Sequence, residues 1–221
     1  MTPERFSRLR TALACRQPDL TVLMDGVNKS HNVSAIVRIA DAVALQTVHA
    51  ISTNAAMRWH HMIAGGARRW VGLALHPSTE FAVAALREQG FRLVGAHACE
   101  GARDFRDVDY TRKTALMVGA ELGGLGAQAL AAADELVAIP MHGLGTSLNV
   151  SVAAGAILLE AERQRCAAGM YDQCRMPLEE FERTLFEWCY PDIAARCREL
   201  KRAYPPLTAD GSLTVNPLLA P

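Results

Sequence analysis

The chain has 221 residues, of which half are hydrophobic and 21% are charged, and its formal net charge is zero. This length suits one sizeable α/β domain with extra elements at its ends. No segment has the roughly 18 apolar residues of a membrane span, and the start, MTPERFSRLR, lacks the apolar stretch of a signal peptide, so we expect no membrane partner and a cytoplasmic location.

Short apolar runs alternate with helical patterns along the chain. In chain order, the pattern predicts a helix over 3–16, a strand over 20–24, a helix over 33–45, a strand over 47–52, a helix over 55–65, a strand over 71–75, a helix over 78–89, strands over 92–96 and 115–118 separated by a charged loop over 100–113, a helix over 126–133, a strand over 136–140, and helices over 147–168, 177–188 and 192–204. This alternation predicts an α/β fold, a mainly parallel Rossmann-like sheet with helices on both faces.

Three predicted parts follow from this order. Residues 1–18 form an N-terminal helical extension, residues 19–168 the main α/β domain, and residues 169–221 a C-terminal helical extension and tail. Six cysteines at 15, 99, 166, 174, 189 and 197 include no C-x-x-C pair, so we expect reduced thiols and no metal site.

Three polar or glycine-rich loops follow predicted strands, at the sheet edge where such folds bind ligands. They read DGVNKSHNVSAIVR after residue 24, GAELGGLG after residue 118 and MHGLGTSLNVS after residue 140. Asn32 and Ser147 can act as N-caps of the helices that follow, which would explain both residues without a role in function. The spacing Gly124-x-Gly126-x-x-Ala129 favours a dinucleotide site only weakly, because the next strand ends without an acidic ribose ligand.

Arg38 is harder to explain by helix formation. It lies between Val37 and Ile39 in a helix with the pattern of a buried seam, where a guanidinium needs a partner or a path to solvent. Glu121 lies in a glycine-rich loop at a strand end, so it is placed for chemistry or for pairing with Arg38.

Basic residues gather near the chain ends. Residues 1–40 hold six Lys or Arg against three Asp or Glu, and residues 196–202 form a second basic cluster. Local patches of this kind can bind nucleic acid despite zero net charge, although solvated helix faces would explain them equally well.

The three loops together resemble the motifs of the SPOUT class of RNA methyltransferases, in its SpoU (TrmH) family of ribose 2′-O-methyltransferases. The matching segments are NVSAIVRIADA from Asn32, VGAELGGL from Val118, and IPM to SLNVSVA between Ile139 and Ala153. The segments at 5–22 and 188–193 resemble the branch that methylates guanosine 18 in tRNA. One departure is Leu122, where many members have Lys or Arg.

The resemblance implies a deep C-terminal trefoil knot, S-adenosylmethionine as cofactor, tRNA as substrate and a homodimer with shared active sites. It implies that Arg38 is catalytic, that Asn32 and Asn149 orient it, and that Glu121 holds the loop or pairs with it. The implied cofactor-binding residues are Ala96, His97, Gly119, Ile139, Met141, Ser147 and Leu148. Candidates to bind the tRNA backbone are Arg5, Arg8, Arg16, Arg198, Lys201 and Arg202.

A guanidinium titrates above about 12 and is not an ordinary base. Arg38 could bind the adjacent phosphate bidentately and position the ribose, which we favour, or act as a base if its surroundings lower its pKa. The alternatives for the whole chain are a 2′-O-methyltransferase for another RNA such as ribosomal RNA, an RNA-binding protein without turnover, and, more remotely, a dinucleotide-dependent oxidoreductase.

Overall fold

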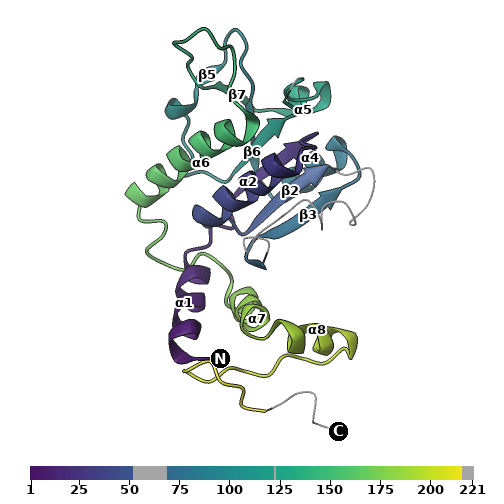
Figure 1. The fold of residues 1–221 in the computed structure, drawn as a ribbon, viewed down its shortest axis with the longest axis vertical. Helices are drawn as coiled ribbons and strands as arrows, with labels where there is room; N and C mark the ends of the chain where they lie inside the picture. The colour runs from purple at the N-terminus through teal and green to yellow at the C-terminus, as the bar shows by residue number, and fades with distance from the viewer. Residues whose placement is uncertain (52–68, 122, 216–221) are drawn as a thin grey trace. The chain divides into compact units, whose positions relative to one another are not determined.

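The computed structural model describes residues 1–51, 69–121 and 123–215 of the chain (Figure 1). The predicted helix over 55–65 and the departure at Leu122 therefore lie outside the described residues. The chain forms two compact units: a larger one over Gln17–Met170, and a smaller one that combines Met1–Arg16 with Tyr171–Pro221.

The larger unit is built on a seven-stranded sheet in which every paired neighbour is parallel. The strands are β1 (Leu20–Asp25), β2 (Thr47–Ile51), β3 (Gly72–His76), β4 (Arg92–Ala96), β5 (Arg103–Asp104), β6 (Thr114–Gly119) and β7 (Glu135–Ala138), in the order β3-β2-β1-β6-β4-β7-β5. The predicted parallel α/β sheet is thus confirmed. Strand β5 and a 3-10 turn over Phe105–Asp107 lie inside the segment predicted as a loop.

Helices cover both faces of this sheet. On one face α2 (Ser30–Ala42) packs against α6 (Val150–Ala167), and on the other α4 (Thr79–Glu88) packs against α5 (Ala127–Ala132) (Figure 1). Strand β1 serves both cores, because alternate residues point to opposite faces: Val22 and Met24 join the α2–α6 core, whereas Leu23 joins the α4–α5 core.

Two expected helix starts are wrong by a few residues. Helix α2 begins at Ser30 with Lys29 as its N-cap, so Asn32 lies within the first turn and is not a cap. Helix α6 begins at Val150, and its cap is Asn149, whose side chain accepts a hydrogen bond from the Ser151 N–H. Ser147 therefore lies before the helix that it was expected to cap, and the Asn32 side chain is available for a contact other than capping.

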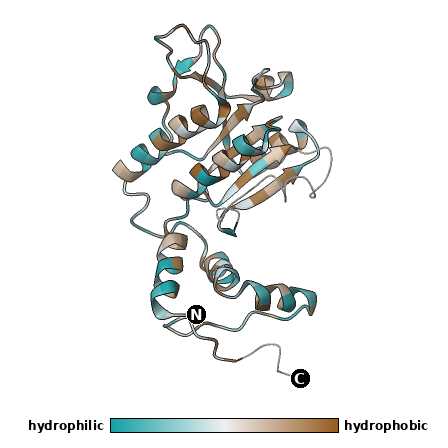
Figure 2. Cartoon of the chain, viewed as in Figure 1, coloured by the Kyte–Doolittle hydropathy of each residue, from teal (hydrophilic) through white to brown (hydrophobic). Residues whose placement is uncertain are grey.

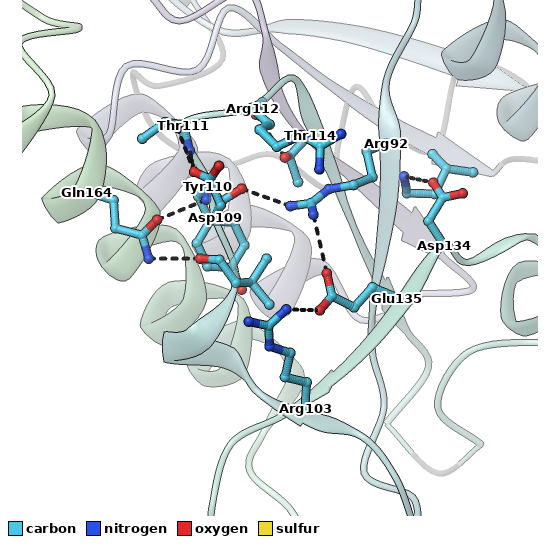
Figure 3. Close-up of polar contacts among 12 residues, drawn as sticks. Arg92, Arg103, Asp109, Tyr110, Thr111, Arg112, Thr114, Asp134, Glu135 and Gln164 are labelled. Atoms are coloured by element: carbon cyan, nitrogen blue, oxygen red, sulfur yellow. Dashed lines mark hydrogen bonds and ion pairs between the residues drawn. The ribbon is translucent and has the colours of Figure 1, made fainter.

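The amino ends of β4 and β7 are joined by a network of polar side chains (Figure 3). Glu135 accepts hydrogen bonds from Arg92 at 3.3 Å and Arg103 at 2.9 Å, and Gln164 of α6 bonds the main chain at Val108 and Tyr110. These contacts fix the segment between β4 and β6 to α6. They leave the opposite, carboxyl edge of the sheet for a binding site.

The smaller unit contains α1 (Pro3–Ala14), α7 (Leu178–Cys189) and α8 (Pro191–Glu199). Thr2 caps α1 as expected from the sequence, and its side chain accepts a hydrogen bond from the Arg5 N–H. Helix α8 stops at Glu199 rather than 204, and Lys201 just after it has a left-handed φ of 53°. Figure 2 shows α1 and α8 as largely hydrophilic, whereas hydrophobic residues recur along α2 and α6.

Among the described residues, no helix is long and apolar enough to cross a membrane. Within the same part of the chain, no three His, Cys, Asp or Glu side chains come together as a possible metal site.

Candidate active site

A cavity of about 420 Å³ lies at the carboxyl ends of β4, β6 and β7. Its volume is within the range of small-molecule sites, and its position is the one expected for ligands of parallel α/β sheets. All seven residues predicted to bind the cofactor line it: Ala96, His97, Gly119, Ile139, Met141, Ser147 and Leu148. The structure therefore brings together residues from three separate loops, while their binding role stays a prediction.

One wall of the cavity is a glycine-rich turn, of which the structure describes residues 119–121, 123 and 124. Ala120 and Gly124 exchange two main-chain hydrogen bonds of 2.8 Å, and Gly124 has a φ of +65°. A Cβ atom on Gly119 would lie 1.9 Å from the carbonyl carbon of Gly124, so any larger residue at 119 would force the turn open. Because Gly119, Ala120, Gly123 and Gly124 carry little or no side chain, main-chain groups form much of this wall.

The other walls combine apolar and polar side chains. Ile139, Met141 and Leu148 offer apolar surface, and His97 and Ser147 offer polar groups. Sequence reasoning missed several lining residues further along α6, including Val150, Ala153 and Ile157. The spacing of these three along the helix could have identified the face of α6 that closes the cavity.

The two Asn-Val-Ser segments meet beside this cavity. Asn149 donates a hydrogen bond from Nδ2 to Oδ1 of Asn32 at 3.2 Å, and the Ser151 hydroxyl donates to Oδ1 of Asn149 at 2.6 Å. The same hydroxyl lies 3.4 Å from Oδ1 of Asn32. Asn32 itself is only 1% exposed, so its amide is held in one place by neighbours from α6.

Glu121 completes this group from the glycine-rich turn. Its carboxylate accepts a hydrogen bond from Nδ2 of Asn32 and forms an ion pair with Lys29. We call Asn32, Glu121, Asn149 and Ser151 the asparagine cluster. Ser151 and Lys29 were not among the predicted site residues, although each belongs to a loop that the sequence had singled out.

Arg38 does not lie in the buried seam that the sequence pattern suggested, and of the two alternatives left open, a partner or a path to solvent, the structure shows the second. Arg38 is exposed, and it forms no hydrogen bond or ion pair with any described residue, Glu121 included. The reason is helical phase: Val33, Ile36, Val37 and Ala40 form the buried face of α2, and Arg38 lies about 100° round the helix from Val37. Its guanidinium is therefore open to a ligand.

The predicted RNA-binding residues of the smaller unit differ in exposure and in their partners. Arg5 and Arg8 are exposed on α1, and their guanidinium groups pair with no described residue. Lys201 and Arg202 are exposed after α8, and Arg198 is held by Glu187 at 3.0 Å and Tyr204 at 2.9 Å.

The prediction for Arg16 is wrong. Arg16 is 3% exposed, and its guanidinium stacks over the Trp188 ring at 5.1 Å from the ring centroid. It stabilises the smaller unit and does not present a charge at the surface.

The protein has a parallel α/β fold with a ligand-sized cavity at the strand ends and a polar cluster beside it. This arrangement is that of an α/β protein that binds a small molecule at the carboxyl edge of its sheet. A model of the SpoU rRNA Methylase family matches residues 19–159, and a model of the C-terminal segment of SpoU rRNA methylases matches residues 163–216. The chain therefore belongs to the SpoU methylase family.

Individual members of this family are similar to the chain over most of its length. The tRNA (guanosine(18)-2′-O)-methyltransferase of Escherichia coli K12 is 44% identical over 215 residues, which cover 96% of this chain and 94% of that protein. The crystal structure of the Aquifex aeolicus TrmH/SpoU tRNA modifying enzyme has a TM-score of 0.77 and 36% identity, and the match covers 86% of this chain and 96% of that one.

A more distant structure contains a cofactor. The SpoU methyltransferase AviRb from Streptomyces viridochromogenes, solved in complex with AdoMet, has a TM-score of 0.60 and 32% identity. The match covers 68% of this chain and 62% of AviRb.

Proposed function

We propose that the chain transfers a methyl group from S-adenosylmethionine to the ribose 2′-hydroxyl of guanosine 18 in tRNA. The observation that carries the proposal is the asparagine cluster beside a cavity lined by all seven predicted cofactor residues. The likeness to the E. coli enzyme across nearly the whole of both chains supports guanosine 18 in particular.

The cavity suits this cofactor. Apolar side chains at 139, 141 and 148 can cover an adenine ring, and main-chain groups of the turn over 119–124 can bond the polar atoms of the ligand. When bound, the cofactor supplies an electrophilic methyl group, so the remaining tasks are to place the ribose and to remove its proton. The loops at 96, 119 and 141–148 are those that we propose to form the trefoil knot.

Arg38 is suited to the first of these tasks. Its exposed guanidinium can bind a backbone phosphate through two parallel hydrogen bonds, which fixes both the position and the direction of the neighbouring ribose. We favour this role over that of a base, because a guanidinium carries a planar fork of hydrogen-bond donors and no acceptor. The bound phosphate or a water then accepts the 2′-hydroxyl proton.

The asparagine cluster is suited to holding the site together. Asn32 lies in the first turn of α2, Asn149 caps α6, and Glu121 comes from the glycine-rich turn. Their hydrogen bonds therefore join three elements at one point. The Asn32 amide is satisfied on both sides, with its nitrogen donating to Glu121 and its oxygen accepting from Asn149. In this role the cluster orients α2, and with it Arg38, relative to the cofactor.

A homodimer is supported by the surface beside the site. Residues 141–149 are exposed throughout, and Leu144 is fully exposed. Val152 and Leu159 of α6 are 55% and 51% exposed and lie seven residues apart, which places them on the same side of the helix. Apolar side chains arranged in this way next to an active site favour a second copy of the chain as the partner.

Exposed basic side chains at both chain ends support contact with the tRNA backbone. Arg5 and Arg8 lie three residues apart on α1, so they project from one side of the helix. Together with Lys201 and Arg202 they can neutralise phosphates without reading sequence. An enzyme with this substrate would work in the cytoplasm, where tRNA is processed.

The test is methylation of unmodified tRNA transcripts and, in parallel, of ribosomal RNA by the purified chain with labelled S-adenosylmethionine, followed by mapping of 2′-O-methyl positions. Methyl groups at guanosine 18 would support the proposal, and methylation confined to ribosomal RNA would favour the alternative substrate. Tight tRNA binding without methyl transfer would favour an RNA-binding protein. Titration with NAD provides the control for the oxidoreductase alternative.

A further inference from the structure

Asp25 is a buried carboxylate that the proposed mechanism does not use. It is the last residue of β1, and it is 9% exposed. Its Oδ1 accepts a hydrogen bond from the Thr79 hydroxyl at 2.9 Å, and its Oδ2 accepts one from the Gly126 N–H at 2.8 Å. A buried carboxylate is costly to desolvate, and the donors that satisfy this one come from two other segments of the chain.

One of these bonds fixes the far end of the cavity wall. Gly126 is the N-cap of α5, and it closes the segment 119–126 that contains the glycine-rich turn and Glu121. The near end of the same segment is Gly119, which pairs with Asp25 in the sheet register. Asp25 therefore borders both ends of the segment that contains the wall, at Gly119 through the strand pairing and at Gly126 through its side chain.

The fit at Gly126 is close. A Cβ atom on Gly126 would lie 3.2 Å from Oδ2 of Asp25, which is tighter than ordinary van der Waals contact. A larger residue at 126 would require the carboxylate to shift by a few tenths of an ångström. A shift of the Asp25 side chain would move the start of α5 and the turn before it.

The chain that leaves Asp25 leads to the asparagine cluster. Gly26 has a φ of +75°, and a Cβ there would lie 3.7 Å from the Cβ of Ala120, so β1 turns away directly beneath the wall. Six residues after Gly26 comes Asn32, which donates to Glu121 of that same wall. Asn32 and Glu121, the two partners of this hydrogen bond, thus each lie on a segment that begins next to Asp25: Asn32 on the chain that follows β1, and Glu121 on the chain that follows Gly119.

We propose that Asp25 is a positioning residue for methyl transfer: its hydrogen bonds to Gly126 and Thr79 set the cavity wall and, through Glu121, the place of Asn32. The inference rests on the proposed function for its catalytic readout. It assigns no direct contact with cofactor or RNA to Asp25, which is not among the residues that line the cavity.

The test compares three variants. Asp25→Ala removes both acceptors, whereas Asp25→Asn keeps an oxygen for the Gly126 N–H and an amide that can donate to the Thr79 hydroxyl. Asp134→Ala is the matched control. Asp134 also accepts a main-chain hydrogen bond, from the Leu93 N–H at 2.7 Å, and bonds Arg87, but it does not line the cavity.

Two measurements are made on the full-length chain: affinity for S-adenosylmethionine without RNA by calorimetry, and kcat and KM for tRNA. We expect Asp25→Ala to weaken cofactor affinity roughly tenfold or more and to lower kcat, with KM for tRNA unchanged, because a displaced wall misplaces the reacting groups. Asp25→Asn should retain the cofactor affinity and the kcat of the parent chain within roughly threefold. Asp134→Ala should lower the melting temperature and leave cofactor affinity as it is.

Amide hydrogen exchange separates this inference from the proposed function, because it requires no activity. Asp25→Ala should speed exchange of the amides in 119–126, and Asp134→Ala should not. If Asp25→Ala fails to fold, Thr79→Val removes one donor and should give a smaller change in the same direction. Unchanged exchange and unchanged cofactor affinity in Asp25→Ala would overturn the inference, as would an equal loss of affinity in Asp134→Ala. An inactive wild-type chain with protected amides would instead contradict the proposed function alone.

Discussion

The amide nitrogen of Asn149 lies 3.2 Å from the amide oxygen of Asn32, although 117 residues separate the two along the chain. Each asparagine begins an Asn-Val-Ser segment in the first turn, or at the cap, of a helix. The fold turns this repetition into one contact beside the cavity. The asparagine pair is therefore the structural centre of the proposed active site.

Asn32→Ala should abolish most methyl transfer while the protein stays folded. Asn32 is not a helix cap, so its loss removes two side-chain hydrogen bonds, a cost of about 1–3 kcal/mol in stability. Turnover should fall by roughly 100-fold, because Glu121 and Asn149 lose their common partner. Single-turnover methylation and a thermal melt measure the two effects. An unfolded variant would point to a structural role.

Arg38→Lys should lose most of its activity despite keeping the positive charge. Lysine cannot form the two parallel hydrogen bonds that orient a phosphate, so we expect kcat/KM for tRNA to fall by roughly tenfold or more. Affinity for S-adenosylmethionine should not change, because Arg38 does not line the cavity. Nearly normal turnover by the lysine variant would exclude the positioning role.

Leu159→Glu should convert a dimer into a monomer and reduce activity with it. The substitution places a charge in the middle of the exposed apolar side of α6. Phe81→Glu is the matched control, because Phe81 is 65% exposed on α4, which covers the opposite face of the sheet. Sedimentation equilibrium measures the mass of each variant. A monomeric wild-type chain with full activity would contradict the shared site.

Arg5→Ala combined with Arg8→Ala should weaken tRNA binding uniformly and reduce its salt dependence. Removal of one phosphate-binding cation lowers the slope of log affinity against log salt by about 1, so the double variant should lower it by about 2. Arg16→Ala should leave that slope unchanged and instead lower stability, since Arg16 is buried over Trp188. Binding titrations at several salt concentrations test both. An unchanged slope in the double variant would remove α1 from the RNA interface.

His49 should make the folded state less stable as the pH falls. Burial and the neighbouring His76, whose Nε2 lies 2.9 Å from Nδ1 of His49, lower the pKa of His49 to about 4. The unfolded chain binds this proton near pH 6.5, whereas the folded chain does not. The contribution of neutral His49 to the free energy of unfolding is therefore fully present above pH 6.5 and is lost as the pH drops toward 4. The loss amounts to about 3 kcal/mol at most.

Denaturant unfolding between about pH 7 and about pH 4.5 measures this decline. His49→Gln removes the titrating group, so the variant should show a shallower dependence over the same window. An equal slope in the variant and the parent would assign the decline to other groups.

Much of the fold could be predicted because it depends on short-range patterns. Apolar runs of about five residues identify β1, β4 and β6, and capping residues such as Ser78 place the helix starts near them. That a cavity forms at the strand ends was predictable, since the loops after β4, β6 and β7 all leave the carboxyl edge of one parallel sheet.

The remaining features depend on long-range contacts that no local pattern records. Arg165 has the sequence context of an ordinary helix surface, yet it is fully buried and bonds Gln17, Asp19 and the main chain at Tyr110. Likewise, Glu121 pairs with Lys29 rather than Arg38 because of the way α2 is rotated about its axis. A rotation by one residue, about 100°, would change which side chains face the core.

The most direct test of the account is the position of the methyl group. Unmodified tRNA transcripts are incubated with the chain and S-adenosylmethionine, and 2′-O-methyl sites are mapped by resistance of the backbone to alkaline cleavage. We predict one new methyl group, on the ribose of guanosine 18, and its loss in the Asn32→Ala and Arg38→Ala variants. A methyl group elsewhere, or none on any tRNA from a folded chain that binds the cofactor, would contradict it.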